Sequence, residues 1–321
     1  MPTDHTIPPA AYLQLTRRQL LDKGEEGLNR LENCRLCPRQ CEANRVEGNT
    51  GFCQTGRRSL LASFQLHFGE EAPLVGNQGS GTLFFSGCNL GCVFCQNVDI
   101  SQDPASGAEV QADQLAEAML RLQEQGALNI NLVTPTHVVP QILEALVPAR
   151  EAGLRLPLVY NCGGYESLET LELLEGVVDI YMPDIKFANP RLAEKYCRAT
   201  DYPQRARAAL REMHRQTGDL RIDDRGAAFR GLLVRHLLMP GELAGSEEWF
   251  AFLASEISEN TYLNIMDQYR PCARARLYPE LQSGLSREEY EQALHLAKSY
   301  GLTRLDQRNQ RSLQAFFRRL Q

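Results

Sequence analysis

Apolar residues in the central part of the chain form two kinds of segment, short continuous runs and longer stretches with helical spacing. The runs are typical of strands buried on both faces, whereas Leu115, Met119 and Leu122 share one face of a helix. The predicted strands are 81–85, 129–134, 156–161, 177–182, 231–239 and 263–268. The predicted helices are 111–125, 139–149, 166–174, 190–196, 204–216, 247–258 and 287–299. Because strands and helices alternate without a long linker, the pattern predicts an α/β fold, a partial (β/α)6 barrel of the TIM type with parallel strands.

The segments on either side of this repeat have patterns of their own. Leucines spaced among charged residues predict a helix within 15–33, and 60–74 is typical of short strands or a hairpin. The predicted domains are 1–75, an N-terminal helix with a cysteine-rich metal-binding segment, and 76–321, the partial barrel with C-terminal helices. Apolar residues on one helical face near the C-terminus predict a docked terminal helix: Leu313, Phe316, Phe317 and Leu320.

Composition and charge exclude several classes of protein. Hydrophobic residues make up 43% of the 321 positions, charged residues 23%, and the formal net charge is −6, so a nucleic-acid partner is not expected. No apolar run approaches the roughly 20 residues that a membrane span requires, and the N-terminus lacks the apolar core of a signal peptide. Ten cysteines without a secretory signal favour reduced thiols and metal sites over disulfides. We therefore expect a cytoplasmic protein.

Three cysteines follow the first predicted strand directly. Cys88, Cys92 and Cys95 have the spacing C-x3-C-x2-C on a glycine-containing loop. Three thiolates can hold three irons of a [4Fe–4S] cluster, and the fourth iron then keeps an open position where chemistry can occur. A zinc knuckle or three buried reduced thiols are the alternatives, although cytosolic cysteines with such spacing usually bind metal or carry out redox chemistry.

A second group of cysteines precedes the repeat. Cys34, Cys37, Cys41 and Cys53 have the spacing C-x2-C-x3-C-x11-C, which brings four thiolates within 20 residues. Four thiolates are enough to close a tetrahedral metal site, and a compact glycine-containing segment of this kind needs a metal to fold. Structural zinc and a second iron–sulfur cluster both fit the spacing, with zinc favoured, and an unmetallated segment remains an alternative.

The predicted strands end in polar residues. Because the active site of a parallel β/α barrel lies at the carboxyl ends of its strands, these side chains are expected to gather at one rim, opposite the cysteine loop. They are Thr134 and Thr136 after the second strand, Asn161 after the third, Asp184 and Lys186 after the fourth, Arg235 in the fifth and Gln268 after the sixth. A structural ion pair between Asp184 and Lys186 is the alternative to a binding role.

The stretch Ser86-Gly87-Cys88-Asn89-Leu90-Gly91-Cys92-Val93-Phe94-Cys95-Gln96-Asn97 resembles the cluster loop of radical S-adenosylmethionine (SAM) enzymes. From about 81 to 269 the chain resembles those related to the pyruvate formate-lyase activating enzyme, through Asp184-Ile185-Lys186 and Arg235…Pro240-Gly241. The pattern around the first four cysteines is similar to an uncharacterised branch with activating-enzyme-like members. The resemblance departs at Thr134-Pro135-Thr136-His137, where the family usually has Gly-Gly-Glu, and at Gln268-Tyr269, where it has a histidine.

The resemblance implies a function. Cys88, Cys92 and Cys95 would ligate a [4Fe–4S] cluster whose open iron binds the amino and carboxylate groups of SAM, and a reductant such as flavodoxin or ferredoxin would supply the electron. Reductive cleavage of SAM would then yield a 5′-deoxyadenosyl radical that abstracts hydrogen from a substrate. Phe94 would pack beside the adenine and Lys186 would face the SAM carboxylate. The further SAM contacts would come from Thr134, Thr136, Asn161, Asp184, Arg235 and Gln268.

Several functions remain compatible with these residues. The first is an activating enzyme that installs a glycyl radical on a protein partner, and the second is radical modification of a peptide, a nucleoside or another small molecule. A non-catalytic iron–sulfur electron carrier would not need the polar strand ends, and a zinc-ribbon nucleic-acid binder is disfavoured by the acidic balance. Cys162, Cys197 and Cys272 are expected to be inert reduced thiols.

Overall fold

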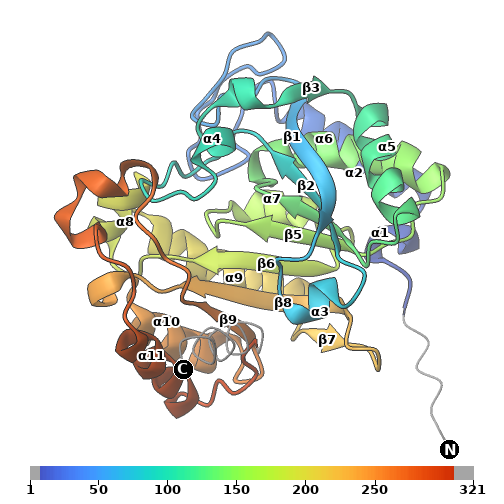
Figure 1. Cartoon of the computed structure of the whole chain (residues 1–321). Coiled ribbons are helices and arrows are strands. Elements are labelled where there is room, and N and C mark those ends of the chain that lie inside the picture. The colour runs from blue at the N-terminus through green and yellow to red at the C-terminus, as the bar shows by residue number, and fades with distance from the viewer. Residues whose placement is uncertain (1–7, 307–321) are drawn as a thin grey trace, which may run out of the picture.

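A mostly parallel sheet forms the centre of the molecule (Figure 1). The computed structural model describes residues 8–306. Within that range the parallel strands, each paired with the next, are β2 (Ser80–Phe85), β4 (Ile130–Val133), β5 (Leu158–Cys162), β6 (Ile180–Ile185), β8 (Ala228–Leu237) and β9 (Tyr262–Met266). These are the six strands expected from the sequence, which confirms the α/β fold with a parallel sheet. Its curvature into a partial barrel remains a prediction.

Three further strands extend this sheet in the antiparallel sense. β1 (Ser59–His67) pairs with β2 and with β3 (Ala108–Val110), and β7 (Arg221–Ile222) pairs with β8. The segment expected to form short strands or a hairpin is thus one strand, β1, followed by the short helix α3 (Ala72–Val75). Its hairpin partner is the first parallel strand itself. Because this pairing is antiparallel, His67 at the end of β1 lies beside Ser80 at the start of β2.

Helices cover the sheet as the apolar spacing predicts. The helices after the cysteine loop are α5 (Ala112–Glu124), α6 (Val139–Glu151), α7 (Leu168–Leu173), α8 (Pro190–Cys197), α9 (Tyr202–Thr217), α10 (Ser246–Phe252) and α11 (Arg287–Ser299). α5 packs on β2 and β4, α9 packs on β6 and β8, and α10 contacts α11. Two shorter helices are α1 (Ala11–Gln14) and α4 (Val98–Ser101).

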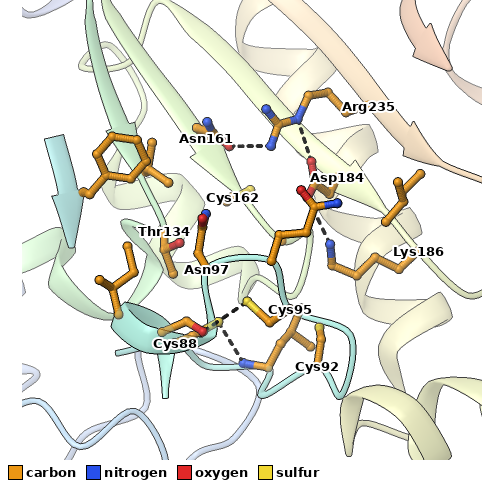
Figure 2. Close-up of a pocket in the computed structure, with 18 of the residues that line it drawn as sticks. Cys88, Cys92, Cys95, Asn97, Thr134, Asn161, Cys162, Asp184, Lys186 and Arg235 are labelled. Carbon is orange, nitrogen blue, oxygen red and sulfur yellow. Dashed lines mark hydrogen bonds and ion pairs between the residues drawn. The ribbon is translucent and has the colours of Figure 1, made fainter. Parts of the chain in front are cut away.

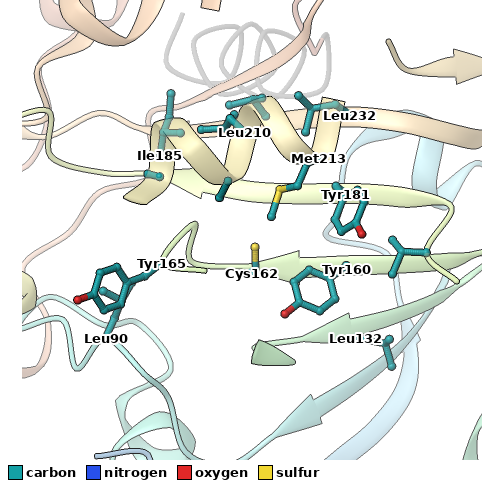
Figure 3. Packing of buried hydrophobic residues seen from close by; sticks show 14 of the residues in the cluster. Leu90, Leu132, Tyr160, Cys162, Tyr165, Tyr181, Ile185, Leu210, Met213 and Leu232 are labelled. Atoms are coloured by element: carbon teal, nitrogen blue, oxygen red, sulfur yellow. The ribbon is translucent and has the colours of Figure 1, made fainter. Parts of the chain in front are cut away.

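The strands are buried on both faces, which explains their continuous apolar sequences. Every residue of β5 is buried, and the ring of Tyr160 lies 5.8 Å from the ring of Tyr181 on β6, edge to face. Met213 and Leu210 of α9 cover this pair from one side (Figure 3). Tyr160 and Tyr181 keep their hydroxyls hydrogen-bonded, to Glu166 and Gln216 respectively, so the buried polar atoms are satisfied.

The N-terminal helix α2 (Arg17–Asn29) holds the cysteine-rich segment against the rest of the protein. It begins with a capping box, in which the Thr16 hydroxyl accepts the Gln19 N–H and the Gln19 side chain accepts the Thr16 N–H. It packs on α6, and Gly27 permits the close approach because a Cβ there would lie 3.3 Å from Pro140 Cα. Residues 30–58, which carry the four cysteines, follow without regular helix or strand and lie beside the cysteine loop.

Two expectations from the sequence concern the ends and the membrane. The apolar face formed by Leu313, Phe316, Phe317 and Leu320 lies outside the described residues. Among residues 8–306, none of the helices combines the length and the apolar character needed to cross a bilayer.

Candidate functional site

The three cysteines of the loop after β2 open onto one cavity at the carboxyl ends of the parallel strands (Figure 2). The cavity has a volume of about 350 Å³ and is lined by Cys88, Cys92 and Cys95 on one side. The loop makes its tight bend through Gly87 and Gly91, with φ of +85° and +71°, a backbone region that favours glycine. It then leads into α4, where the Ser101 hydroxyl lies 3.1 Å from Cys95 Sγ.

The environment of these three thiols suits soft metal ligation. Burial raises the pKa of Cys88 to about 12, and burial also raises the pKa of Cys95. The pKa of Cys92 is raised by its hydrogen bond with Cys197 and by burial. Because thiolates are the ligand form, a cation in the cavity must supply the charge that stabilises them. Three sulfur donors around one cavity, Cys92 buried and Cys88 and Cys95 half-buried, therefore fit an iron–sulfur cluster.

A network of charged side chains forms the opposite wall of the cavity. Asp184 Oδ1 accepts a hydrogen bond from Arg235 Nε at 2.6 Å, and Oδ2 accepts one from Lys186 Nζ at 2.9 Å. Arg235 also donates to Asn161 Oδ1 at 3.0 Å and to Glu70 Oε2 at 3.2 Å. The parallel register produces this contact, since Asp184 on β6 stands directly beside Arg235 on β8. The network holds two cations and two carboxylates at the cavity surface.

The charges in this wall are stable over a wide pH range. Burial alone would raise the pKa of Asp184, but Arg235 and Lys186 outweigh it and hold that pKa at about 2. Burial opposes the charge of Lys186, yet Asp184 and Cys92 keep the pKa of Lys186 well above its ordinary value. Both groups are therefore ionised near neutral pH. A zwitterionic amino acid group could pair with the cation of Lys186 and with the carboxylates of the wall.

Most of the other residues expected at the rim lie around the same cavity. Phe94, Thr134, Asn161 and Gln268 line it, and the Phe94 ring packs edge-on against Phe187 at 5.6 Å. Thr136 is the exception, because its hydroxyl donates to Glu166 Oε1 at 2.7 Å, and Thr136 does not line the cavity. The residue following β4, Thr134, has a positive φ of +59°, which turns the backbone at this rim.

Several lining residues were missed from the sequence. His67 and Glu70 come from the end of β1 and the turn before α3, and Asn97 and Ser101 follow the cysteine loop. Glu70 and Glu71 are adjacent acidic residues after a strand, which was the available signal, but only Glu70 lines the cavity, whereas Glu71 accepts a hydrogen bond from Asn264. Glu166 was also missed. It is fully buried behind the rim and accepts hydrogen bonds from Thr136 and from Tyr160 at 2.9 Å.

The four N-terminal cysteines line a second, smaller cavity of about 20 Å³. The Phe52 N–H donates to Cys41 Sγ at 3.3 Å, and Arg45 Nη1 lies 3.7 Å from Cys34 Sγ. Burial raises the pKa of Cys37 to about 12, with smaller effects from Cys53 and Cys34. In residues 8–306, no three His, Cys, Asp or Glu side chains are disposed around a single metal ion as they stand.

Comparison with known proteins agrees with this geometry. Residues 82–246, half of the chain, match the family described as the radical SAM superfamily, and the chain belongs to that superfamily. The matched segment begins in β2 and ends at the start of α10, so it contains the cysteine loop and all of the charged wall except Glu70. Membership implies an enzyme that uses a [4Fe–4S] cluster and SAM as co-substrate.

Two relatives come from Methanocaldococcus jannaschii. One uncharacterized protein is 34% identical over 300 residues, which cover 90% of this chain and 82% of the relative. A second uncharacterized protein is 29% identical over 186 residues, 53% of this chain and 54% of that relative. The first similarity extends well beyond the superfamily segment, so the two proteins share most of their length, including residues outside 82–246.

Proposed function

We propose that Cys88, Cys92 and Cys95 hold the [4Fe–4S] cluster and that the charged wall opposite them receives the methionine part of SAM. The observation that supports this most directly is that three thiols and the Asp184–Lys186–Arg235 network face each other across one cavity. Lys186 is the partner for the SAM carboxylate. Asp184 holds both Lys186 and Arg235, and so orients the cations before SAM arrives.

The protein's own residues provide binding, orientation and exclusion of water. When bound, the cluster supplies the electron that cleaves the sulfonium of SAM to methionine and a 5′-deoxyadenosyl radical, which abstracts hydrogen from a substrate. Phe94 offers an aromatic surface for the adenine, braced by Phe187 and Tyr269. Thr134, Asn161 and Gln268 line the cavity and offer polar atoms to the ribose and amino groups. Thr136 would act only through Glu166.

We propose activation of a glycyl radical protein as the first candidate for the substrate, with a flavodoxin or ferredoxin as reductant. Support comes from the Asp184-Ile185-Lys186 and Arg235 segments, which resemble those of activating enzymes and meet in one network. Radical modification of a peptide, nucleoside or other small molecule is the alternative. It is favoured by Thr134, which takes a turned conformation where activating enzymes usually have glycine. A simple electron carrier would have no use for the charged wall.

We propose a second metal at Cys34, Cys37, Cys41 and Cys53, either zinc or another iron–sulfur cluster. All four cysteines line one small cavity, and Cys34 and Cys41 accept contacts from Arg45 and from a backbone N–H, as metal-bound thiolates do. Residues 30–58 have little regular structure of their own, so a metal would contribute to their folding. Iron, zinc and sulfide analysis of the purified protein would distinguish the two metals.

The test is an anaerobic assay. The reconstituted protein is reduced with dithionite, SAM is added, and 5′-deoxyadenosine is measured together with iron content. The wild type should form deoxyadenosine, Cys92→Ala should lose both the product and the cluster, and the exposed control Glu117→Gln should match the wild type. Lys186→Met should keep its iron and bind SAM at least about tenfold more weakly. A loaded, reducible cluster whose spectrum SAM does not perturb would instead favour an electron carrier.

A further inference from the structure

The side chain of Arg39 connects the N-terminal cysteines to the cysteine loop at the cavity. Arg39 stands between Cys37 and Cys41 in the chain. Its guanidinium donates to the carbonyl oxygens of Asn89 at 2.8 Å and Leu90 at 3.1 Å, both inside the Cys88–Cys92 segment. It also donates to the carbonyls of Cys197, at 3.1 Å, and Arg198 at the end of α8. One side chain therefore joins the cysteine loop to the end of α8.

Phe52 makes the second contact. It precedes Cys53, and its ring centre lies 4.0 Å from the Arg39 guanidinium carbon, so the ring packs on that cation. The same ring lies against Gly91, where a Cβ would come within 3.1 Å of Phe52 Cζ. Tyr165 covers Arg39 as well, at 5.2 Å. The apex of the Cys88–Cys92 segment is thus enclosed by side chains from the N-terminal segment.

A third contact holds the start of the loop. Arg45 Nη1 donates to the His137 carbonyl at 2.8 Å and lies 3.7 Å from Cys34 Sγ. The His137 ring donates from Nε2 to the Ser86 carbonyl at 2.8 Å, two residues before Cys88. A Cβ on Gly87 would lie only 2.5 Å from the Cys53 carbonyl oxygen, so the two backbones touch there.

The residues that make these contacts lie beside or against the N-terminal cysteines. Arg39 is two residues from Cys37 and from Cys41, Phe52 is adjacent to Cys53, and Arg45 touches Cys34. A long side chain such as arginine loses rotamer entropy when it is fixed. A metal that joins the four thiolates fixes the backbone that carries Arg39 and Phe52, and so lowers the entropy still to be lost when the contacts form.

We propose that the four-cysteine segment is a metal-dependent clamp on the loop that carries Cys88 and Cys92. With its metal bound, Arg39 and Phe52 hold the Asn89–Gly91 turn in the conformation that presents both thiolates to one cluster. Without the metal, the turn loosens and the cluster is lost more readily. Arg39 is a positioning residue in this arrangement, since it touches the loop backbone rather than the cavity. The inference rests on the proposed assignment of Cys88, Cys92 and Cys95.

Arg39 also brings a positive charge close to the cluster loop. A nearby cation and hydrogen bonds stabilise the more negative, reduced state of an iron–sulfur cluster. Arg39→Met should therefore make the reduction potential of the cluster more negative, whereas Arg39→Lys, which keeps the charge, should restore part of the potential. The lysine cannot make the fork of hydrogen bonds to several carbonyls, so it should not restore the tightness of cluster binding. A merely structural role would not separate these two readouts.

The experiment compares anaerobically reconstituted full-length variants. Arg39→Met, Arg39→Lys and the double variant Cys37→Ser/Cys53→Ser are compared with Arg35→Met, a matched control whose exposed side chain pairs with Glu42 in the same segment. The measurements are the rate at which a chelator removes iron, the reduction potential, and the electron paramagnetic resonance spectrum of the reduced cluster with and without SAM. Arg39→Met and the double variant should lose cluster affinity by about tenfold or more, as loss of outer-shell contacts typically does. Arg35→Met should match the wild type.

The outcomes separate the clamp from the proposed function. If the wild type binds no SAM-responsive cluster, or Cys92→Ala still binds one, the assignment of the loop fails and the clamp fails with it. Suppose that the wild type holds a cluster that responds to SAM. If Arg39→Met then has the same iron-release rate, reduction potential and spectrum as the wild type, only the clamp is overturned. If circular dichroism shows that the double variant does not fold, the result for Arg39→Met decides, because that variant keeps all seven cysteines assigned to the two metal sites. If the wild-type protein contains one cluster and no further metal, the proposed dependence of the clamp on a metal is overturned.

Discussion

The thiol of Cys92 lies 3.4 Å from the thiol of Cys197, although the two residues are 105 positions apart in the chain. Both are buried, and the backbone beside them is joined by a hydrogen bond from the Val93 N–H to the Tyr196 carbonyl at 2.9 Å. Cys197 was expected from the sequence to be an inert reduced thiol. It is instead in direct contact with one of the three cysteines assigned to the cluster.

This contact predicts an oxidation product. In protein without the cluster, hydrogen peroxide should join Cys92 and Cys197 in a disulfide, with two electrons and two protons leaving the thiols and two waters formed. In cluster-loaded protein the Cys92 sulfur is bound to iron, and the same treatment should give little of this product before iron is lost. Non-reducing peptide mass spectrometry measures the cross-link.

The matched control for this oxidation is Cys197→Ser, which should give no cross-linked peptide. Cys272 serves as a comparison within the same protein, because its thiol donates to the Phe94 carbonyl at 3.1 Å rather than facing another sulfur. A Cys92 that pairs equally with Cys272, or equal cross-linking with and without the cluster, would contradict the prediction.

Asp184 is predicted to support both stability and SAM binding. Asp184→Asn leaves Lys186 and Arg235 buried without their shared carboxylate, and breaking such a buried pair costs about 3 kcal/mol. We expect a lower urea midpoint and roughly tenfold weaker SAM binding, with iron content unchanged. The stabilisation from Asp184 should be present above the ordinary aspartate pKa of about 3.9 and be lost as pH falls toward the folded value of about 2.

Asp22→Asn is the control for Asp184→Asn, since Asp22 pairs with Arg18 on the exposed face of α2 and its side chain is 49% exposed. That variant should match the wild type within experimental error, because exposed pairs contribute little. If Asp184→Asn bound SAM as tightly as the wild type, the network would be structural only.

Glu166 should make stability fall as pH rises. Burial raises the pKa of Glu166 to about 7, against the opposing effect of hydrogen bonds from Thr136 and Tyr160. The folded state therefore binds more protons than the unfolded state between pH 4.5 and 7, and its stability decreases across that window. Glu166→Gln removes this effect, so between pH 5 and 8 the variant should gain about 2 to 3 kcal/mol on the wild type.

The comparison with the Glu166→Gln variant is needed because other buried groups also change the stability of the protein in this pH range. Burial lowers the pKa of His137 and His236 to about 4, so these two make stability rise with pH up to their unfolded value near 6.5. Their contribution is common to wild type and Glu166→Gln and cancels in the difference. Urea unfolding at several pH values measures the difference in stability between the wild type and Glu166→Gln. A difference that stays constant from pH 5 to 8 would show that Glu166 has an ordinary pKa in the folded protein.

The sequence predicts the parts of this molecule that depend on local order. Continuous apolar runs identify β2, β4, β5, β6, β8 and β9, because strands buried on both faces carry no polar alternation. The polar rim was predictable as well, since carboxyl ends of parallel strands meet at one edge, and Asp184 and Arg235 stand side by side for that reason. Spacing alone singled out the loop of Cys88.

What could not be predicted depends on pairings between distant segments. Glu70 follows β1 and contacts Arg235 of β8, 165 positions later in the chain, and no local pattern reveals that contact. Thr136 was placed at the rim from its position after β4, but a buried carboxylate thirty residues later, Glu166, binds its hydroxyl instead. Arg39 lies inside the four-cysteine motif, but its contacts are with carbonyls far along the chain and are visible only in the structure.

The contact between Gly87 and the Cys53 carbonyl predicts different outcomes for two glycines of similar backbone conformation. Gly87 and Gly48 have φ of +85° and +89°, so alanine at either position should cost about 1 kcal/mol of backbone strain. Around Gly48 no atom lies within 4 Å of a built Cβ, whereas at Gly87 the Cβ would be 2.5 Å from a backbone oxygen that cannot swing away. Gly87→Ala must therefore push the cysteine loop away from the N-terminal segment.

We expect the Gly87→Ala variant to bind less iron than the wild type after reconstitution and to release that iron faster to a chelator. The Gly48→Ala variant should lose stability only slightly and keep its iron. Equal iron content in the two variants would mean that this backbone contact does not position Cys88.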